Sequence, residues 1–227
     1  MSGVNIQHAG NRYSARAKII VGADGRNSMV ARDVDAPYEE FTAGFRALYY
    51  RYVRDFTPPV GDKFVGFEFS FFEDEIAYVF PSDNALACVA LSVNLENFQT
   101  MKQDAEMHFV EHLSHHRGIG GRYMAALPDT KLWGTGPQPN YVRVPFGPGW
   151  ALVGDSGLHQ DPWSGHGIDK ASTHATMLAE AIVAGLTDPA NEVQELATYQ
   201  QRRNETALSD YHETINIGRD FRQLFAS

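Results

Sequence analysis

Alternation of apolar and polar residues marks the middle of the chain. Two apolar sets follow a period of two: Val65, Phe67, Phe69 and Phe71 before a turn, and Ile76, Tyr78 and Phe80 after it. Successive side chains of a β-strand point to opposite faces, so this period predicts strands with an apolar face. We expect an antiparallel meander with strands near residues 42–54, 63–72, 75–80 and 85–94.

A spacing of three or four residues predicts helices elsewhere. One apolar stripe comprises Ile168, Ala171, Ala175, Leu178, Ala179 and Ile182. Such a stripe indicates an amphipathic helix that packs on a core. Further helices are expected over residues 28–33 and 101–116 and, at the end of the chain, over residues 191–225. Over residues 3–23 we expect two or three short strands. Together, the expected helices and strands predict an α/β (α+β) fold class.

Composition and charge narrow the range of possible functions. Hydrophobic residues make up 43% of the 227 positions and charged residues 21%, which is typical of a soluble globular protein. There is no signal-peptide pattern and no apolar run of about 18 residues, so we expect a cytoplasmic protein. A net charge of −9 without a Lys/Arg cluster argues against nucleic-acid and anionic-membrane partners. Cys88, the only cysteine, excludes an intramolecular disulfide and is expected to be a buried thiol.

The segment from Trp150 to Ile182 carries the clearest functional pattern. An apolar strand comes first, followed by the pairs Gly154-Asp155 and Asp161-Pro162, then Gly165-x-Gly167, and finally the striped helix. An aspartate at a strand end can accept hydrogen bonds from a polyol. Glycines at a helix start let the first N–H groups approach a ligand closely, and the helix dipole there favours negative charge.

This order of motifs resembles the GD motif of the FAD-dependent monooxygenases related to para-hydroxybenzoate hydroxylase. A second match precedes it: the strand Ile19–Ala23 ends in Asp24-Gly25 before a basic helix start, which resembles that family's DG motif. Residues 143–150 and 199–203 also stand where the family has similar sequences. The resemblance implies FAD as cofactor and NADPH or NADH as reductant. The reaction would be hydroxylation of an apolar or aromatic small molecule with reduced flavin and oxygen.

The same resemblance implies roles for individual residues. The cofactor-binding residues would be Asp24, Gly25, Gly154, Asp155, Pro162, Gly165 and Gly167. Asp155 would bind the ribitol, and the helix start would face the pyrimidine edge of the flavin. Asp24 would approach the phosphate or ribose region. The alternative for both motifs is a plain turn that an aspartate caps.

Two histidines flank the expected flavin position. His159 and His166 are candidate catalytic residues, because an imidazole can donate a hydrogen bond or act on a substrate phenol near neutral pH. The alternative is that each is a polar residue that fixes its loop. A separate set, His108, His112 and His115, has a spacing that can share a metal ion. With no acidic or cysteine partner evident, we expect no metal there.

The family resemblance also divides the chain. Residues 1–40 and 141–190 would form a partial, Rossmann-like FAD-binding domain, residues 41–140 an antiparallel-sheet substrate domain, and residues 191–227 a C-terminal helical segment. The GxGxxG that holds the ADP pyrophosphate in such enzymes is not found, since both near matches, at 118–123 and 165–170, lack the third glycine. An alternative function is therefore a cofactor-poor descendant of the fold, acting as a small-molecule binding module or a non-redox catalyst such as a cyclase.

Aromatic residues concentrate in the predicted substrate domain. Thirteen of the 27 in the chain lie between Phe41 and Phe80. They are suited to a pocket for a planar apolar substrate, with Tyr49, Tyr52, Phe67 and Phe69 as the foremost candidates. The alternative is that these rings fill the space between the sheet and the helices.

Overall fold

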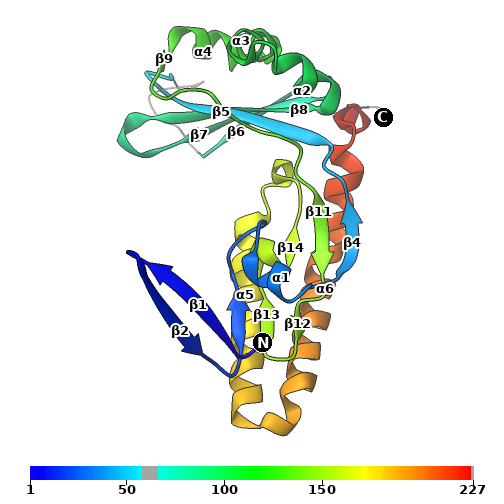
Figure 1. Cartoon of the computed structure of the whole chain (residues 1–227). Coiled ribbons are helices and arrows are strands. Elements are labelled where there is room, and N and C mark those ends of the chain that lie inside the picture. The colour runs from blue at the N-terminus through cyan, green and yellow to red at the C-terminus, as the bar shows by residue number, and fades with distance from the viewer. Residues whose placement is uncertain (58–65, 226–227) are drawn as a thin grey trace. The chain divides into compact units, whose positions relative to one another are not determined.

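The computed structural model describes residues 1–57 and 66–225 (Figure 1). The chain forms two compact units: Met1–Thr42 with Pro139–Thr214, and Ala43–Gln138 with Ile215–Ser227. The predicted C-terminal helical segment, residues 191–227, is divided between the two units. Several antiparallel sheets and a long C-terminal helix confirm the mixed α/β fold class.

The first unit contains three small sheets. A two-stranded hairpin pairs β1 (Gly3–His8) with β2 (Asn11–Arg16). The second sheet has the order β12-β13-β3 and comprises β3 (Ile20–Gly22), β12 (Phe146–Gly147) and β13 (Trp150–Leu152). The third has the order β14-β11-β4 and comprises β4 (Tyr38–Thr42), β11 (Asn140–Arg143) and β14 (Leu158–His159). Strands β3 and β13 run parallel, so their carboxyl ends lie at the same edge.

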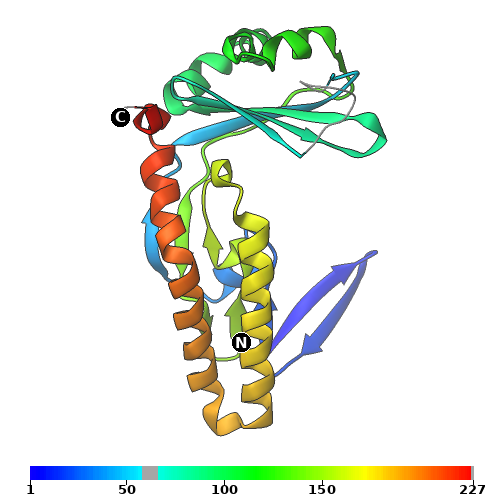
Figure 2. The ribbon, with the colours of Figure 1, turned by 180° about the vertical axis from the view of Figure 1, so that it is seen from behind.

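Two long helices and one short one complete this unit. Helix α1 (Met29–Asp33) follows β3, and α5 (Gly167–Thr187) lies beside α6 (Glu192–Gly218), as Figure 2 shows from behind. The core between β13 and these two helices consists of Ala151, Val153, Leu178, Ala181, Leu196 and Tyr199. The predicted stripe on α5 is wrong at three of its six positions, because Ile168 is 83% exposed and Ala175 and Ala179 are exposed as well. The residues that α5 buries are His174, Leu178, Ala181 and Gly185.

The second unit is built on one antiparallel sheet with the order β10-β5-β8-β7-β6. Its strands are β5 (Arg46–Arg54), β6 (Glu68–Phe72), β7 (Glu75–Pro81), β8 (Ala87–Asn94) and β10 (Trp133–Thr135), and the short β9 (Leu127–Pro128) also pairs with β5. The predicted strand 42–54 is divided between β4 and β5. Val65 and most of the predicted start of the strand 63–72 lie outside the described residues, and β6 begins at Glu68.

Three helices cover one face of this sheet (Figure 1): α2 (Leu95–Met101), α3 (Ala105–His115) and α4 (Gly120–Ala125). The helix predicted over residues 101–116 corresponds to α3, which begins later than predicted, at Ala105. Asn94 caps α2 by accepting from the N–H of Asn97, and Asp104 caps α3 by accepting from the N–H of Met107. Apolar residues such as Val89, Leu91 and Phe109 fill the space between sheet and helices.

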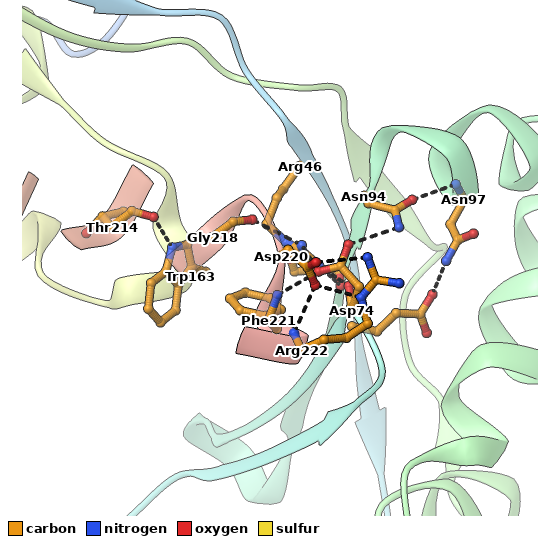
Figure 3. A network of polar contacts seen from close by, with 12 residues as sticks. Arg46, Asp74, Asn94, Asn97, Trp163, Thr214, Gly218, Asp220, Phe221 and Arg222 are labelled. Carbon is orange, nitrogen blue, oxygen red and sulfur yellow. Dashed lines mark hydrogen bonds and ion pairs between the residues drawn. The ribbon is translucent and has the colours of Figure 1, made fainter. Parts of the chain in front are cut away.

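A buried arginine anchors the last turn of the chain to the same sheet (Figure 3). The Arg46 side chain is only 1% exposed and donates five hydrogen bonds to Ser92, Asp74 and the carbonyl of Gly218. Asp74 also accepts from the N–H of Phe221, the first residue of the 3₁₀ segment Phe221–Phe225. The Arg46 guanidinium lies 4.0 Å from the centroid of the Phe221 ring. One cation thus joins β5, β8 and the turn between β6 and β7 to the C-terminal segment.

Candidate functional site

A cleft of about 430 Å³ in the first unit brings the sequence motifs together. It is lined by Ala23, Gly25, Val153, Gly154, Asp155, Gly167, Ile168, Ala171 and Ala175. The DG motif follows β3 and the GD motif follows β13, and α5 begins beside them. Crevices at the carboxyl ends of parallel strands are the usual ligand sites of open α/β sheets.

The start of α5 opens into this cleft with its backbone exposed. Gly165 has a φ of +73°, and no heavy atom of the described residues lies within 4 Å of a Cβ added at Gly165 or Gly167. The N-cap residue His166 makes no side-chain cap hydrogen bond within the described part of the chain. The first amide groups of a 21-residue helix are therefore available to an electronegative ligand atom.

The two loops at the strand ends supply the other wall. Gly25 and Gly154 have φ values of +75° and +63°, conformations that a side chain would strain. A Cβ at Gly154 would lie 3.4 Å from the Cβ of Ala171, so glycine lets the GD loop approach α5. Asp155 is half-buried and lines the cleft. These residues fit the ribitol and ring edge of a flavin, which present hydroxyl groups and electronegative atoms.

Asp24 has a local structural role. Its Oδ2 accepts from the N–H groups of Met29 at 2.7 Å and Val30 at 3.3 Å, at the start of α1. Burial raises the pKa of this carboxyl, but hydrogen bonds from Ser28 and from these two amides outweigh burial and lower the pKa overall. The capped-turn interpretation thus accounts for the Asp24 carboxylate, whereas Gly25 beside it lines the cleft.

The remaining candidate site residues, His159, His166 and Pro162, have different local surroundings. His159 is buried, with Nδ1 2.6 Å from the carbonyl oxygen of Pro139, so it holds its loop and does not line the cleft. His166 is exposed at the start of α5. Pro162 begins a 3₁₀ turn that Asp161 caps by accepting from the N–H of Trp163. Neither histidine is among the residues described as lining the cleft, and both catalytic assignments stay predictions.

Residues beneath the two loops were missed by sequence reasoning. The Tyr141 hydroxyl contacts the carbonyl oxygens of Asp155 and Arg26, and the Arg143 guanidinium donates to the carbonyl of Ser156. Ser156 Oγ in turn contacts the carbonyl of Gly22. The only sequence signal noted in this region is the family-like stretch 143–150, and that likeness does not identify the partners of the polar side chains on β11.

The predicted substrate residues fall on both faces of the sheet in the second unit. Tyr49 lies opposite Leu91 on the helix-covered face and is 5% exposed, so it belongs to the core. Tyr52 lies on the other face of the sheet. It pairs across the strands with Cys88, which in turn pairs with Phe80 on the same face. Phe69 shares that second face through its pairing with Tyr78. The prediction that Tyr49 shares a pocket with the other three residues is therefore wrong.

The second face presents a cluster of rings. Phe67 is 60% exposed and Phe69 45% exposed, and their ring centroids lie 4.7 Å apart. Both rings also lie 6.2 Å from the ring of Phe80. We name this group, with Tyr52 and Tyr78, the aromatic face. Exposed apolar clusters of this kind are common at ligand-binding and partner-binding surfaces.

The helix histidines have an acidic partner that sequence reasoning did not find. Glu75 lies 2.7 Å from Nδ1 of His112 and accepts from Asn97, and its second oxygen lies 3.9 Å from Nε2 of His116. The converging residues are thus His112 and His116, which differ from the predicted trio. No group of three or more such side chains among the described residues is arranged to hold a metal ion.

This cluster predicts a pH dependence of folding. Burial raises the pKa of Glu75, but the hydrogen bond from His112, the nearby His116 ring and the hydrogen bond from Asn97 outweigh burial and lower the pKa from 4.5 to about 2. The bond to Glu75 in turn raises the pKa of His112 above 6.5. The Glu75 contribution, at most about 3 kcal/mol, is lost as pH falls from 4.5 toward 2. The His112 contribution is lost as pH rises through its raised pKa.

We therefore expect this cluster to stabilise the protein most between about pH 4.5 and 6.5. Urea unfolding measured across the pH range should show that maximum in the parent, and Glu75→Gln should flatten it. If the parent and the Gln variant show the same dependence of unfolding free energy on pH, the cluster does not set the stability maximum.

Comparisons with known proteins agree with the cleft geometry. The sequence profile of the FAD binding domain family matches residues 2–210, and the chain belongs to this family. The chain is 24% identical to the digeranylgeranylglycerophospholipid reductase of Methanosarcina acetivorans, over 99% of this chain and 54% of that protein. The reductase of the same name from Thermoplasma volcanium is 27% identical over 82% of this chain and 43% of that protein. The chain thus spans about half the length of these curated relatives.

Solved structures of FAD-dependent enzymes share the fold. The myxobacterial chondrochloren halogenase CndH matches with a TM-score of 0.82 and 20% identity, over 93% of this chain and 49% of that one. PqsL of Pseudomonas aeruginosa, described as a probable FAD-dependent monooxygenase, matches with a TM-score of 0.72 and 21% identity, over 95% and 61%. Aklavinone-11 hydroxylase matches with a TM-score of 0.76 and 15% identity, over 94% and 39%. The predicted family resemblance is confirmed.

Among the described residues, no helix is both long and apolar enough to cross a membrane.

Proposed function

We propose that the cleft binds the flavin end of FAD and that the chain is part of an FAD-dependent oxidoreductase, specifically a monooxygenase that hydroxylates an apolar or aromatic small molecule. The observation that carries the proposal is the convergence of Gly25, Gly154, Asp155 and Gly167 on one cleft at the start of α5. Membership of the FAD binding domain family supports the choice of cofactor. NADPH or NADH as the reductant rests on the family resemblance alone.

Each wall of the cleft has a task in this proposal. Asp155 accepts hydrogen bonds from ribitol hydroxyls, and the open amides at the start of α5 stabilise negative charge at the ring edge. A helix terminus contributes ~0.3–1 kcal/mol to such a charge at an exposed site, and more where water is excluded. Flavin, once bound and reduced, supplies the activation of oxygen. The protein binds and orients it and shields the ring from water.

We expect the chain by itself to bind FAD weakly. In related folds the pyrophosphate lies on a GxGxxG turn, and no such motif occurs in the 227 residues. A fluorescence titration with FAD should therefore give a dissociation constant that falls when an N-terminal βαβ segment carrying GxGxxG is supplied. Purification of the chain with stoichiometric, tightly held flavin would contradict weak binding. Failure of the extended protein to bind FAD would favour a cofactor-poor binding module or a non-redox catalyst.

A second reaction has support from the curated relatives. Two proteins that match most of the chain are named as reductases, so reduction of a substrate is the competing proposal. The two reactions differ in their use of oxygen. Coupled consumption of oxygen and reduced nicotinamide, with one oxygen atom recovered in the product, supports monooxygenation. Product formation under anaerobic conditions with an equivalent of reduced flavin supports the reductase.

The aromatic face predicts the substrate class. Burial of a ring against such a surface stabilises binding by ~1.5–3 kcal/mol, which favours a planar apolar ligand, such as a phenol or polyketide-like ring system, over a highly charged one. We expect Phe69→Ala to weaken binding of a planar aromatic ligand more than it lowers unfolding stability. Phe98→Ala is the matched control, because Phe98 lies in the helix-covered core. If Phe69→Ala instead costs the ~3–5 kcal/mol of a core truncation and leaves ligand affinity unchanged, the face is not a ligand surface.

A further inference from the structure

A single hydroxyl group contacts both loops of the cleft. Tyr141 Oη lies 2.6 Å from the carbonyl oxygen of Asp155 in the GD loop and 3.0 Å from that of Arg26 in the DG loop. Asp155 lines the cleft, and Arg26 directly follows Gly25, which also lines it. Both oxygens are acceptors, so the only proton that can join them is the one on the tyrosine.

The Tyr141 ring is held so that this hydroxyl stays in place. Tyr141 is 1% exposed, and its ring contacts the Arg143 guanidinium at 4.4 Å and the His159 ring at 5.6 Å between centroids. Arg143 also donates to the carbonyl of Ser156, the next residue of the GD loop. Burial raises the pKa of Tyr141 to about 12, so the hydroxyl keeps its proton at any ordinary pH and remains a donor.

We propose that Tyr141 is a positioning residue that sets the separation of the DG and GD loops, and thereby the fit of the cleft to flavin. This inference rests on the proposed function. Without the hydroxyl, the two carbonyl dipoles converge with no donor between them, and the loops are expected to move apart. The amides and the Asp155 side chain in these loops would then lose their common alignment toward one ligand.

The test compares two conservative substitutions. Tyr141→Phe removes the hydroxyl and keeps the ring between its neighbours. Tyr199→Phe is the matched control, because Tyr199 is equally buried and its hydroxyl donates to the carbonyl of Leu152 at 2.9 Å, on β13 and in neither of the two loops. Each variant is examined in the chain extended with a GxGxxG segment, and unfolding is measured first so that only folded protein is compared.

We expect Tyr141→Phe to raise the FAD dissociation constant roughly tenfold, the loss associated with one hydrogen bond, and to shift the absorption spectrum of any flavin that still binds. Tyr199→Phe should lower stability to a similar degree and leave FAD affinity near that of the parent. Equal FAD affinity in the parent and Tyr141→Phe, or an equal loss in both variants, would overturn the positioning role.

Hydrogen exchange without flavin separates this inference from the proposed function. The amides around residues 25–28 and 154–157 should exchange faster in Tyr141→Phe than in Tyr199→Phe, and unchanged exchange in both loops would overturn the tie between them. If the extended parent binds no FAD, the proposed function fails, and the flavin-fitting role of Tyr141 fails with it. The exchange measurement would still show whether the hydroxyl joins the loops.

Discussion

Arg46→Ala is expected to destabilise the second unit by about 3–5 kcal/mol, because it removes one partner of a buried ion pair. Asp74 would keep its bonds from Asn94 and from the N–H of Phe221, but its charge would lose the cation 3.0 Å away. The carbonyls of Ser92 and Gly218 would lose their donors as well. For a chain of this size the loss corresponds to a fall in melting temperature on the order of 10 °C.

Two further variants make this expectation specific. Arg46→Lys keeps the charge but cannot reproduce a planar set of five hydrogen bonds, so we expect a smaller, intermediate loss. Arg222→Ala removes an exposed arginine paired with Asp220 in the same segment and should leave the melting curve unchanged. If all three variants have the same melting temperature, the buried network does not anchor the C-terminal segment.

Local patterns predicted the elements because they report which side of an element meets apolar surroundings. They did not report what those surroundings are. Ile168, Ala171 and Ala175 follow the same spacing as core residues of α5, yet they line the cleft. A helix face that meets a ligand cavity and one that meets a core are both apolar, so periodicity alone cannot distinguish them. The same limit placed Tyr49 with Phe69, although the strand register assigns them to opposite faces.

The candidate site was predictable where its residues are neighbours in the chain, and hidden where they are not. The Gly154-Asp155 and Gly165-x-Gly167 motifs lie within one short segment, so their order is visible in the sequence. Tyr141 meets Arg26 across 115 residues, and His112 meets Glu75 across 37. Such pairs depend on strand register and helix placement, which are properties of the folded chain rather than of local spacing.

Asp155→Ala is expected to abolish detectable FAD binding by the chain, or to raise the dissociation constant by roughly 10- to 150-fold in a tighter-binding extended form, without unfolding the first unit. A hydrogen bond to a charged group is worth about 1.5–3 kcal/mol, and Asp155 is the only carboxylate among the residues described as lining the cleft. Its main chain, by contrast, is held by the Tyr141 hydroxyl, a contact that alanine preserves. Stability should therefore change little.

Two controls test this separation of binding from folding. Asp155→Asn keeps an acceptor oxygen and should retain part of the affinity. Asp188→Ala removes an aspartate that caps the turn after α5 by accepting from the N–H of Ala190, and it should leave FAD binding intact. Calorimetric titration and thermal melting of all three variants decide the outcome. A melting temperature that falls in step with affinity in Asp155→Ala would mark this residue as structural, and unchanged affinity would remove it from the ribitol site.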